Sequence, residues 1–343
     1  MPAEDGAMLK RLFKTRVAAK GEPERPRLLG RIGRRARRDG VATANEAAPS
    51  LPMVRPINLP MPTLGGKQVW ADIFIRSGWR IQRNVYSGQC RLLDSNNIRR
   101  ARGTLEQCRH SFERIQKRNP AAVRNGHVVM LVHGLGRSAG TFALLEDSLR
   151  REGYETANVN YPSTRLGIAA HADNLEHIIQ SLEGVTMLSF VTHSLGALVV
   201  RDLLAREREW RNSIAIHRLV MIAPPNKGSQ IADRLKALPA YRWLTGECGQ
   251  GLTTAAAAKL PVPSVDFGII AGGRGNTNGF NPLLPGDNDG LVTVAETALD
   301  GARDFLLVRT THGLVDDHPQ TIDATLSFLR DGCFIPKDPA RTT

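Results

Sequence analysis

Apolar and polar positions follow two alternating patterns from residue 127 onward. Short apolar runs have the length and character of buried strands, and between them lie longer stretches with helical periodicity. The expected strands are 127–133, 154–161, 187–191, 216–223, 265–271 and 304–310, and the expected helices are 141–151, 168–182, 196–204 and 320–329. This alternation predicts an α/β fold with a mostly parallel sheet, helices on both faces, and an active site at the carboxyl ends of the strands.

The stretch 64–126 has a different pattern. Residues 79–85 alternate in polarity, residues 86–89 supply a turn, and residues 90–93 return as a second strand. This pattern predicts an antiparallel hairpin at a sheet edge. A helix over 104–118 follows, capped by Thr104. One face of this helix is apolar and carries Leu105, Cys108, Phe112 and Ile115. The hairpin and helix are expected to lead into the core.

The first 63 residues are basic and lack a regular pattern. Arginines crowd residues 34–38, Ala, Asn and Pro dominate the stretch that follows, and residues 8–17 fit a short basic amphipathic helix imperfectly. We therefore predict three parts: a disordered basic segment over 1–63, the hairpin and helix over 64–126, and the α/β domain over 127–343.

Charge is divided unevenly along the 343 residues, whose formal net charge is +13. Residues 1–128 hold 26 Lys and Arg against 10 Asp and Glu, whereas the remainder holds 20 against 23. An anionic surface is one expected partner of the basic segment, and a solvated tail without a partner is the alternative. Because Phe13 is the only aromatic residue before Trp70, base stacking is disfavoured, and peripheral contact with an anionic membrane is preferred over specific nucleic-acid binding.

Four sparse cysteines, none in a Cys-x-x-Cys pair, predict reduced thiols rather than a disulfide framework or a zinc site. The chain contains neither an apolar run of membrane-spanning length nor the apolar core of a secretory signal. The expected location is therefore the cytoplasm, with peripheral attachment to a membrane surface as an option.

A serine stands where an apolar strand passes directly into a helix, in the sequence Thr192-His193-Ser194-Leu195-Gly196. Such a sharp strand–turn–helix strains the backbone of the middle residue and exposes its side chain. Because the strand and the helix nearly touch there, the residues two positions before and after it must be small. Gly196 meets this requirement and Thr192 meets it in part. Ser194 is thus a candidate nucleophile, and a simple helix N-cap is the alternative.

A serine nucleophile needs a base, and the base needs a carboxylate. Asp289 follows the strand at 265–271, and His312 directly follows the strand at 304–310. Asp287 competes with Asp289 for the role of the acid, and His318, which precedes Pro319, competes with His312 for that of the base. Five further histidines are expected to serve packing or hydrogen bonding: His133, His171, His177, His193 and His217.

Two backbone amides are candidates for an oxyanion hole. The amide of Leu195 begins the helix after the serine, and the amide of Leu135 lies in the glycine-containing loop after the first parallel strand. A plain strand–helix turn is the alternative for the Leu135 loop.

Taken as a set, these motifs resemble those of serine esterases and lipases of the α/β-hydrolase superfamily, bacterial lipases in particular. The resemblance rests on residues 133–136, 192–196 and 288–292, together with His312, and it extends from about residue 127 to the C-terminus. It implies an α/β-hydrolase fold, cleavage of small-molecule or lipid carboxylic esters through an acyl-enzyme, and no cofactor. Val315 stands where many secreted lipases of this type carry an aspartate that binds calcium, so no metal is predicted.

Two questions remain open at this level. The apolar insertion 226–263 is either a small cap over the acyl pocket or a crossover helix with a loop. The reaction is either ester hydrolysis or other serine-dependent acyl chemistry, as in an acyltransferase, a thioesterase or an amidase, because the triad determines the mechanism and the pocket determines the substrate. A catalytically silent binding module with a basic arm is the alternative from another class.

Overall fold

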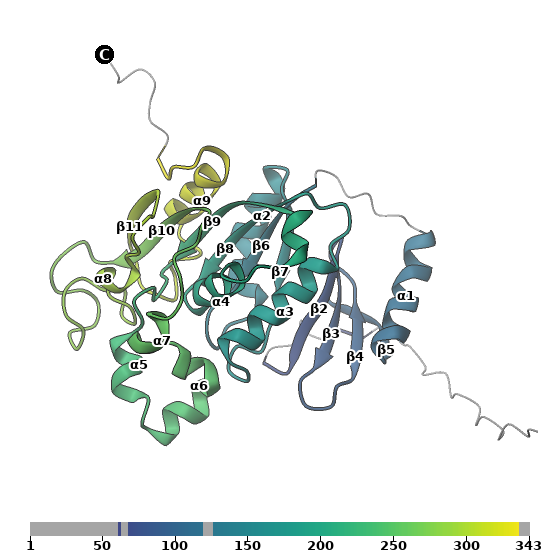
Figure 1. Cartoon of the computed structure of the whole chain (residues 1–343), viewed down its shortest axis with the longest axis horizontal. Helices are drawn as coiled ribbons and strands as arrows, with labels where there is room; N and C mark the ends of the chain where they lie inside the picture. The colour runs from purple at the N-terminus through teal and green to yellow at the C-terminus, as the bar shows by residue number, and fades with distance from the viewer. Residues whose placement is uncertain (1–60, 63–67, 119–125, 336–343) are drawn as a thin grey trace, which may run out of the picture. The chain divides into compact units, whose positions relative to one another are not determined.

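The computed structural model describes residues 61–62, 68–118 and 126–335 (Figure 1). The basic segment lies outside this range except for the two residues of β1 (Met61–Pro62), which pair with a later strand. The amphipathic helix expected at 8–17 and the membrane contact expected of 1–63 therefore lie outside the described residues. Within the described residues, no helix is both long enough and apolar enough to cross a membrane.

The larger sheet consists of six parallel strands. Their order from one edge to the other is β7-β6-β8-β9-β10-β11. The strands are β6 (His127–Val132), β7 (Glu155–Val159), β8 (Met187–His193), β9 (Ala215–Ile222), β10 (Asp266–Gly273) and β11 (Asp304–Arg309). Each overlaps a strand predicted from an apolar run.

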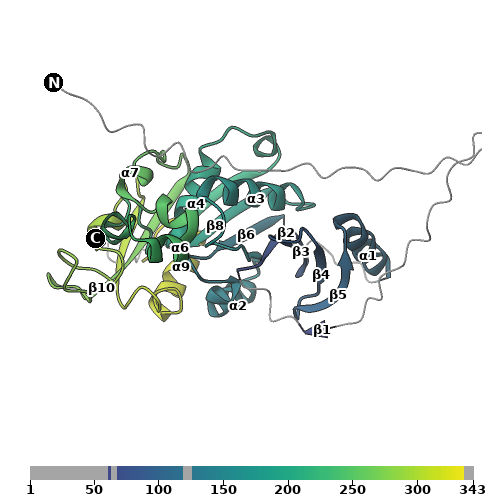
Figure 2. The same ribbon diagram turned by 90° about the horizontal axis from the view of Figure 1, so that it is seen from below.

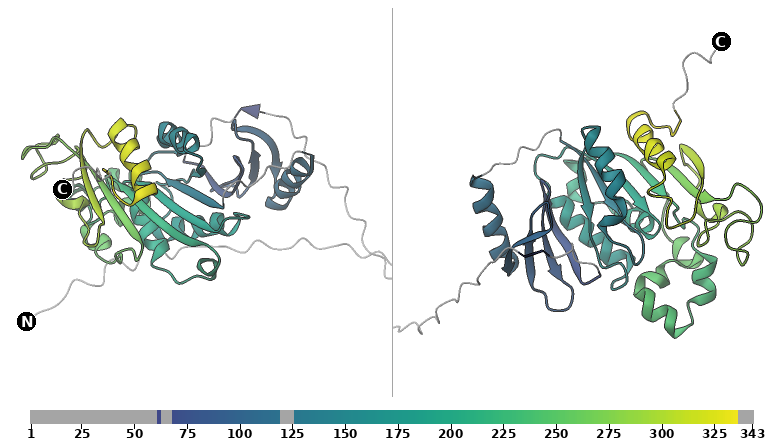
Figure 3. Two further views of the ribbon diagram at one scale, coloured as in Figure 1. Left: turned by 90° about the horizontal axis from the view of Figure 1, so that it is seen from above. Right: turned by 180° about the vertical axis from the view of Figure 1, so that it is seen from behind.

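Helices cover this sheet on both faces (Figure 2). Helices α3 (Ile168–Gln180) and α4 (Leu195–Leu204) lie on one face, and α2 (Ala143–Arg151) and α9 (Pro319–Asp331) lie on the other, which is seen from behind in Figure 3. Side chains of β6 alternate between the two cores: Val128, Met130 and Val132 pack with α3 and α4, whereas Val129 and Leu131 pack with α2 and α9. Burial on both faces explains why the strand sequences are continuously apolar.

The order of the strands creates a crevice at one place in the sheet. From β6 the chain moves outward to β7 and then returns to place β8 on the other side of β6. Because parallel crossovers are right-handed, this reversal puts α2 and α3 on opposite faces. The loops after β6 and β8 therefore diverge, and the crevice between them is where doubly wound sheets bind ligands.

The hairpin prediction is correct for the pairing of the strands and wrong for their position. Strands β3 (Trp79–Asn84) and β4 (Cys90–Leu93) pair antiparallel, but they lie inside a separate five-stranded sheet with the order β1-β5-β4-β3-β2. Its other strands include β2 (Trp70–Arg76) and β5 (Ile98–Gly103). Strand β5 escaped prediction because arginines interrupt its apolar pattern, although it is paired on both sides.

Helix α1 (Leu105–Arg118) covers one face of this small sheet, as its apolar stripe predicts. The backbone amide of Gln107 donates to Thr104 Oγ1 at 3.2 Å, and the amide of Thr104 donates to Gln107 Oε1 at 2.9 Å. This reciprocal capping box confirms that Thr104 starts the helix.

A buried carboxylate joins the small sheet to the large one. Asp72 of β2 accepts hydrogen bonds from Arg80 at 3.0 Å and Gln82 at 2.8 Å within the small sheet, and from the amide of Asn160, just after β7, at 2.7 Å. Burial raises the pKa of Asp72, while Arg80 acts in the opposite direction. Since the Asp72 amide also donates to the Asn160 carbonyl at 2.8 Å, the edge strand β2 of the small sheet is joined to the chain just after the edge strand β7 of the large one.

The insertion 226–263 folds into three short helices between β9 and β10. They are α5 (Gln230–Leu235), α6 (Pro239–Gly251) and α7 (Thr254–Ala257). Helix α6 is kinked at Gly246, whose φ is 59°, and a Cβ there would lie 2.1 Å from the Thr164 carbonyl oxygen. A fourth short helix, α8 (Val294–Thr297), precedes β11.

Candidate active site

Ser194 sits at the turn between β8 and α4 with φ 51° and ψ −120°. This left-handed φ is unfavourable for a residue with a Cβ, and such strain is typical of functional turns. A Cβ on Gly196 would lie 2.2 Å from the carbonyl oxygen of Val132, so only glycine fits two positions after the serine. Thr192 is accommodated because its hydroxyl points away to donate to the Val220 carbonyl at 3.3 Å.

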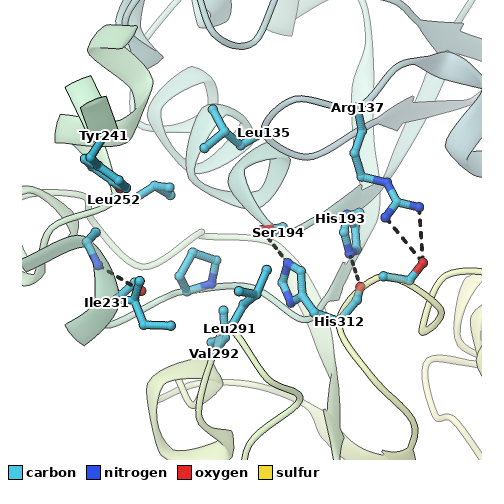
Figure 4. A pocket seen from close by; sticks show the side chains of 14 residues that line it. Leu135, Arg137, His193, Ser194, Ile231, Tyr241, Leu252, Leu291, Val292 and His312 are labelled. Carbon is cyan, nitrogen blue, oxygen red and sulfur yellow. Dashed lines mark hydrogen bonds between the residues drawn. The ribbon is translucent and has the colours of Figure 1, made fainter. Parts of the chain in front are cut away.

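Two hydrogen bonds connect the three predicted side chains, and Figure 4 shows the one between Ser194 and His312. His312 Nε2 lies 3.0 Å from Ser194 Oγ, and His312 Nδ1 lies 2.7 Å from Asp289 Oδ2. The other carboxylate oxygen of Asp289 accepts the amides of Leu291 at 3.0 Å and Val292 at 2.8 Å. Because a carboxylate only accepts, Nδ1 donates to Asp289, and Nε2 is left to accept the serine proton.

The competing residues have other roles in the fold. Asp287 accepts the amides of Arg274 and Gly275, each at 2.8 Å, and thereby closes a turn. His318 caps α9 by accepting the amide of Gln320 at 3.2 Å. The structure thus brings Asp289 and His312 to Ser194, and leaves Asp287 and His318 out of this hydrogen-bonded chain.

The loop after β6 lies against Ser194, as expected of an oxyanion loop. A Cβ on Gly134 would lie 3.1 Å from Ser194 Cβ, and Leu135 lines the pocket beside the serine. No hydrogen bond within the described residues occupies the Leu135 amide. Leu195 is the first residue of α4, where backbone amides have no partner within the helix.

His133 holds the start of this loop without contacting the serine. Its Nδ1 donates to the Gly134 carbonyl at 2.8 Å, its Nε2 accepts the amide of Tyr161 at 3.3 Å, and its ring stacks on that of Tyr161. Burial lowers the pKa of His133 to about 4, so the ring is neutral near pH 7. The sequence predicted a hydrogen-bonding role of this kind.

Two residues that the sequence did not assign to the site hold the loop of His312. His193 Nε2 donates to the His312 carbonyl at 3.1 Å, and burial lowers its pKa far enough to keep the ring neutral. Both terminal nitrogens of Arg137 approach the Gly313 carbonyl at 3.3 Å, and one also contacts Asp316 Oδ2 at 3.3 Å. No motif signal marks Arg137, since its partners are about 180 residues away along the chain.

Asp316, the ionic partner of Arg137, is fully buried. Burial raises the pKa of its carboxyl to about 6, and Arg137 acts in the opposite direction. Its Oδ1 has no hydrogen-bond partner among the described residues. The ion pair therefore compensates only part of the cost of burying this charge.

A mostly apolar pocket of about 310 Å³ opens beside Ser194 and His312. The helical insertion forms one wall through Ile231, Tyr241 and Leu252, and the acid loop forms another through Leu291 and Val292. The insertion 226–263, for which the sequence left a cap or a crossover helix as alternatives, thus supplies part of the pocket wall. Sequence had identified its apolar residues but could not place them beside the serine.

Comparisons with known proteins give a partial match to one family model and several structural likenesses. Residues 98–259 match a family model described as a domain of unknown function, DUF7379. The matched range includes Ser194 but neither Asp289 nor His312. No curated protein matches the sequence. The fold is similar to that of the mature lipase BlEst2 of Bacillus licheniformis, at 19% identity and a TM-score of 0.48 over 59% of this chain and 91% of the other.

Two further solved structures are similar at the same level. A metagenomic carboxyl esterase, MGS0156, has 22% identity and a TM-score of 0.42, over 56% of this chain and 67% of the other. Phospholipase PlaB from Legionella pneumophila has 17% identity and a TM-score of 0.47, over 62% and 61%. The strand order of this chain and the sharp turn at Ser194 are those of an α/β-hydrolase fold.

Proposed function

We propose that the protein is a serine hydrolase that cleaves carboxylic esters through an acyl-enzyme. The observation that carries the proposal is the hydrogen-bonded chain from Asp289 through His312 to Ser194, which ends in the apolar pocket. A serine hydroxyl needs a positioned base to act as a nucleophile, and the base needs a carboxylate to hold its tautomer.

In the proposed reaction Ser194 Oγ attacks the ester carbonyl and gives its proton to His312 Nε2. The amides of Leu135 and Leu195 stabilise the oxyanion, and His312 then protonates the leaving alcohol. Water, activated by the same histidine, releases the acid. Asp289 stabilises the histidine cation in both steps. Because Leu135, Ile231 and Leu252 line the pocket, the substrate is expected to carry an apolar acyl or alcohol group.

A second serine in the pocket provides a matched control. The hydroxyl of Ser229 accepts the amide of Ala232 as the N-cap of α5 and has no histidine partner in the described structure. Ser194→Ala should lower kcat for p-nitrophenyl esters by several orders of magnitude and abolish labelling by a fluorophosphonate probe. Ser229→Ala should keep the activity and the probe labelling of the wild type. Its free energy of unfolding should fall by about 1 kcal/mol because the cap of α5 is lost.

A panel of p-nitrophenyl esters with increasing acyl length, tested beside thioesters and amides, distinguishes the chemistries that a serine triad supports. We expect the enzyme to hydrolyse the esters with a higher kcat/KM than the thioesters or the amides. Wild-type activity in Ser194→Ala would refute the proposed mechanism. Probe labelling without turnover of any ester would assign the site to another acyl reaction.

A further inference from the structure

A second concavity, which we call the α1–α3 groove, lies between helices α1 and α3. In Figure 2 both helices lie on the same side of the small sheet. They are set apart along the sheet, with β2 and β3 in the interval between them. The groove has a volume of about 370 Å³ and shares no lining residue with the pocket of Ser194. Its apolar surface comes from Ala71 and Ile73 of β2, Leu105 of α1, and Pro162 and Leu166 of the loop before α3.

Two positive charges at this groove have no ionic partner among the described residues. Arg83 of β3 and Arg109 of α1 both line it, and within the described part of the chain neither guanidinium takes part in an ion pair or hydrogen bond. Asp173, the only carboxylate among the described lining residues, is held by Arg206. Two exposed arginines beside an apolar surface therefore offer ten N–H donors to an acidic group.

A buried histidine adds an unused polar group. His171 is 1% exposed and lines the groove, and neither of its ring nitrogens has a hydrogen-bond partner among the described residues. Burial lowers the pKa of His171 to about 4, against a smaller opposing effect of the Leu166 backbone, so the ring is neutral. Since the contact with the Leu166 backbone is too weak to count as a hydrogen bond, the ring can still donate to a bound oxygen or a water molecule.

We propose that the α1–α3 groove is a second, non-catalytic binding site for an amphipathic anion. The acidic group would lie between Arg83 and Arg109, and the hydrocarbon part would lie along Ala71 and Leu105. An anion without a hydrocarbon part would leave the apolar surface wet, and a neutral lipid would leave both guanidinium groups without a partner. The volume suits a small molecule rather than a folded partner.

Isothermal titration calorimetry of the full-length protein with decanoate at pH 8 tests the site directly. Saturable binding is expected in the wild type. Arg83→Gln and Arg109→Gln should each weaken it about fivefold, and the double variant more strongly. Arg114→Gln provides the matched control, because this exposed arginine is on the same helix but does not line the groove, and it should bind decanoate as the wild type does.

Further ligands separate the parts of the proposal. Decanol and inorganic phosphate should each bind more weakly than decanoate. Decanol has no charge to pair with the arginines, and phosphate has no hydrocarbon chain to cover the apolar surface. Decyl phosphate should bind, and its affinity relative to decanoate identifies the preferred headgroup. Ala170→Trp, which fills the groove from α3, should abolish binding of both anions.

Two results would overturn the assignment. One is decanoate binding that survives unchanged in the Arg83→Gln, Arg109→Gln double variant, which would place the ligand elsewhere, including the pocket of Ser194. The other is equal weakening by Arg114→Gln, which would reduce the effect to net charge. A circular-dichroism spectrum of each variant verifies that the loss does not come from misfolding.

Discussion

The buried carboxyl of Asp316 makes the stability of the protein depend on pH in a predictable direction. Its pKa rises from 3.8 to about 6 on folding because the carboxyl is buried. The folded state therefore binds this proton more tightly than the unfolded state does. The resulting stabilisation is complete below pH 3.8 and is lost as the pH rises through 6.

The magnitude follows from the two pKa values. A difference of about two units corresponds to about 3 kcal/mol when integrated over the whole titration, and to about 2 kcal/mol between pH 4.5 and 7.5. Asp316→Asn removes the titration while leaving an oxygen for Arg137. The free energy of unfolding of the wild type should thus fall by about 2 kcal/mol more than that of the variant across this interval.

Urea denaturation at pH steps between 4.5 and 7.5 measures this difference. Comparing the two proteins at each pH cancels the titration of all other groups. Asp317→Asn is a useful control, since it removes an exposed neighbouring carboxylate and keeps the buried one. Parallel pH profiles for the wild type and Asp316→Asn, or a steeper loss in the variant, would refute the reasoning.

Two further substitutions test the geometry of the site. Asp289→Asn should lower kcat about 10⁴-fold by favouring the wrong tautomer of His312, whereas Asp287→Asn, which alters a turn, should retain most activity; equal losses would contradict the assignment of the acid. Gly196→Ala should lower the free energy of unfolding by about 1–3 kcal/mol, because its Cβ meets the backbone of β6, as urea denaturation would measure. Gly140→Ala, where the nearest atom is 3.7 Å away, should be nearly neutral.

Sequence identified the large sheet and the residues of the candidate triad for a local reason. Buried parallel strands are continuously apolar, so 127–133 and 187–191 stand out. Ser194 and His312 follow directly after such strands, and Asp289 lies in the loop after the strand at 265–271. Ser194, Asp289 and His312 could therefore be found one at a time, and their chain order suggested that they belong together.

The parts that sequence missed depend on contacts between distant segments. Arg137 contacts Gly313 and Asp316, which lie nearly at the other end of the domain's sequence. No local pattern distinguishes this arginine from other arginines of the surface. Strand β5 was hidden by its arginines, because its pairing with β4 rather than its polarity defines it. His193 was predicted as a hydrogen-bonding residue, but only the fold shows that its acceptor is the backbone of His312.

The joint at Asp72 has a consequence for the order in which the chain folds during synthesis. Arg80 and Gln82 leave the ribosome within 10 residues of Asp72, whereas Asn160 follows 88 residues later. Until then the small sheet presents β2 as an open edge, the kind of surface on which strands of other chains pair. Asn160 supplies the missing partner of Asp72 at this edge, so synthesis of residues 73–160 is an interval in which the joint is incomplete and β2 is open to other strands.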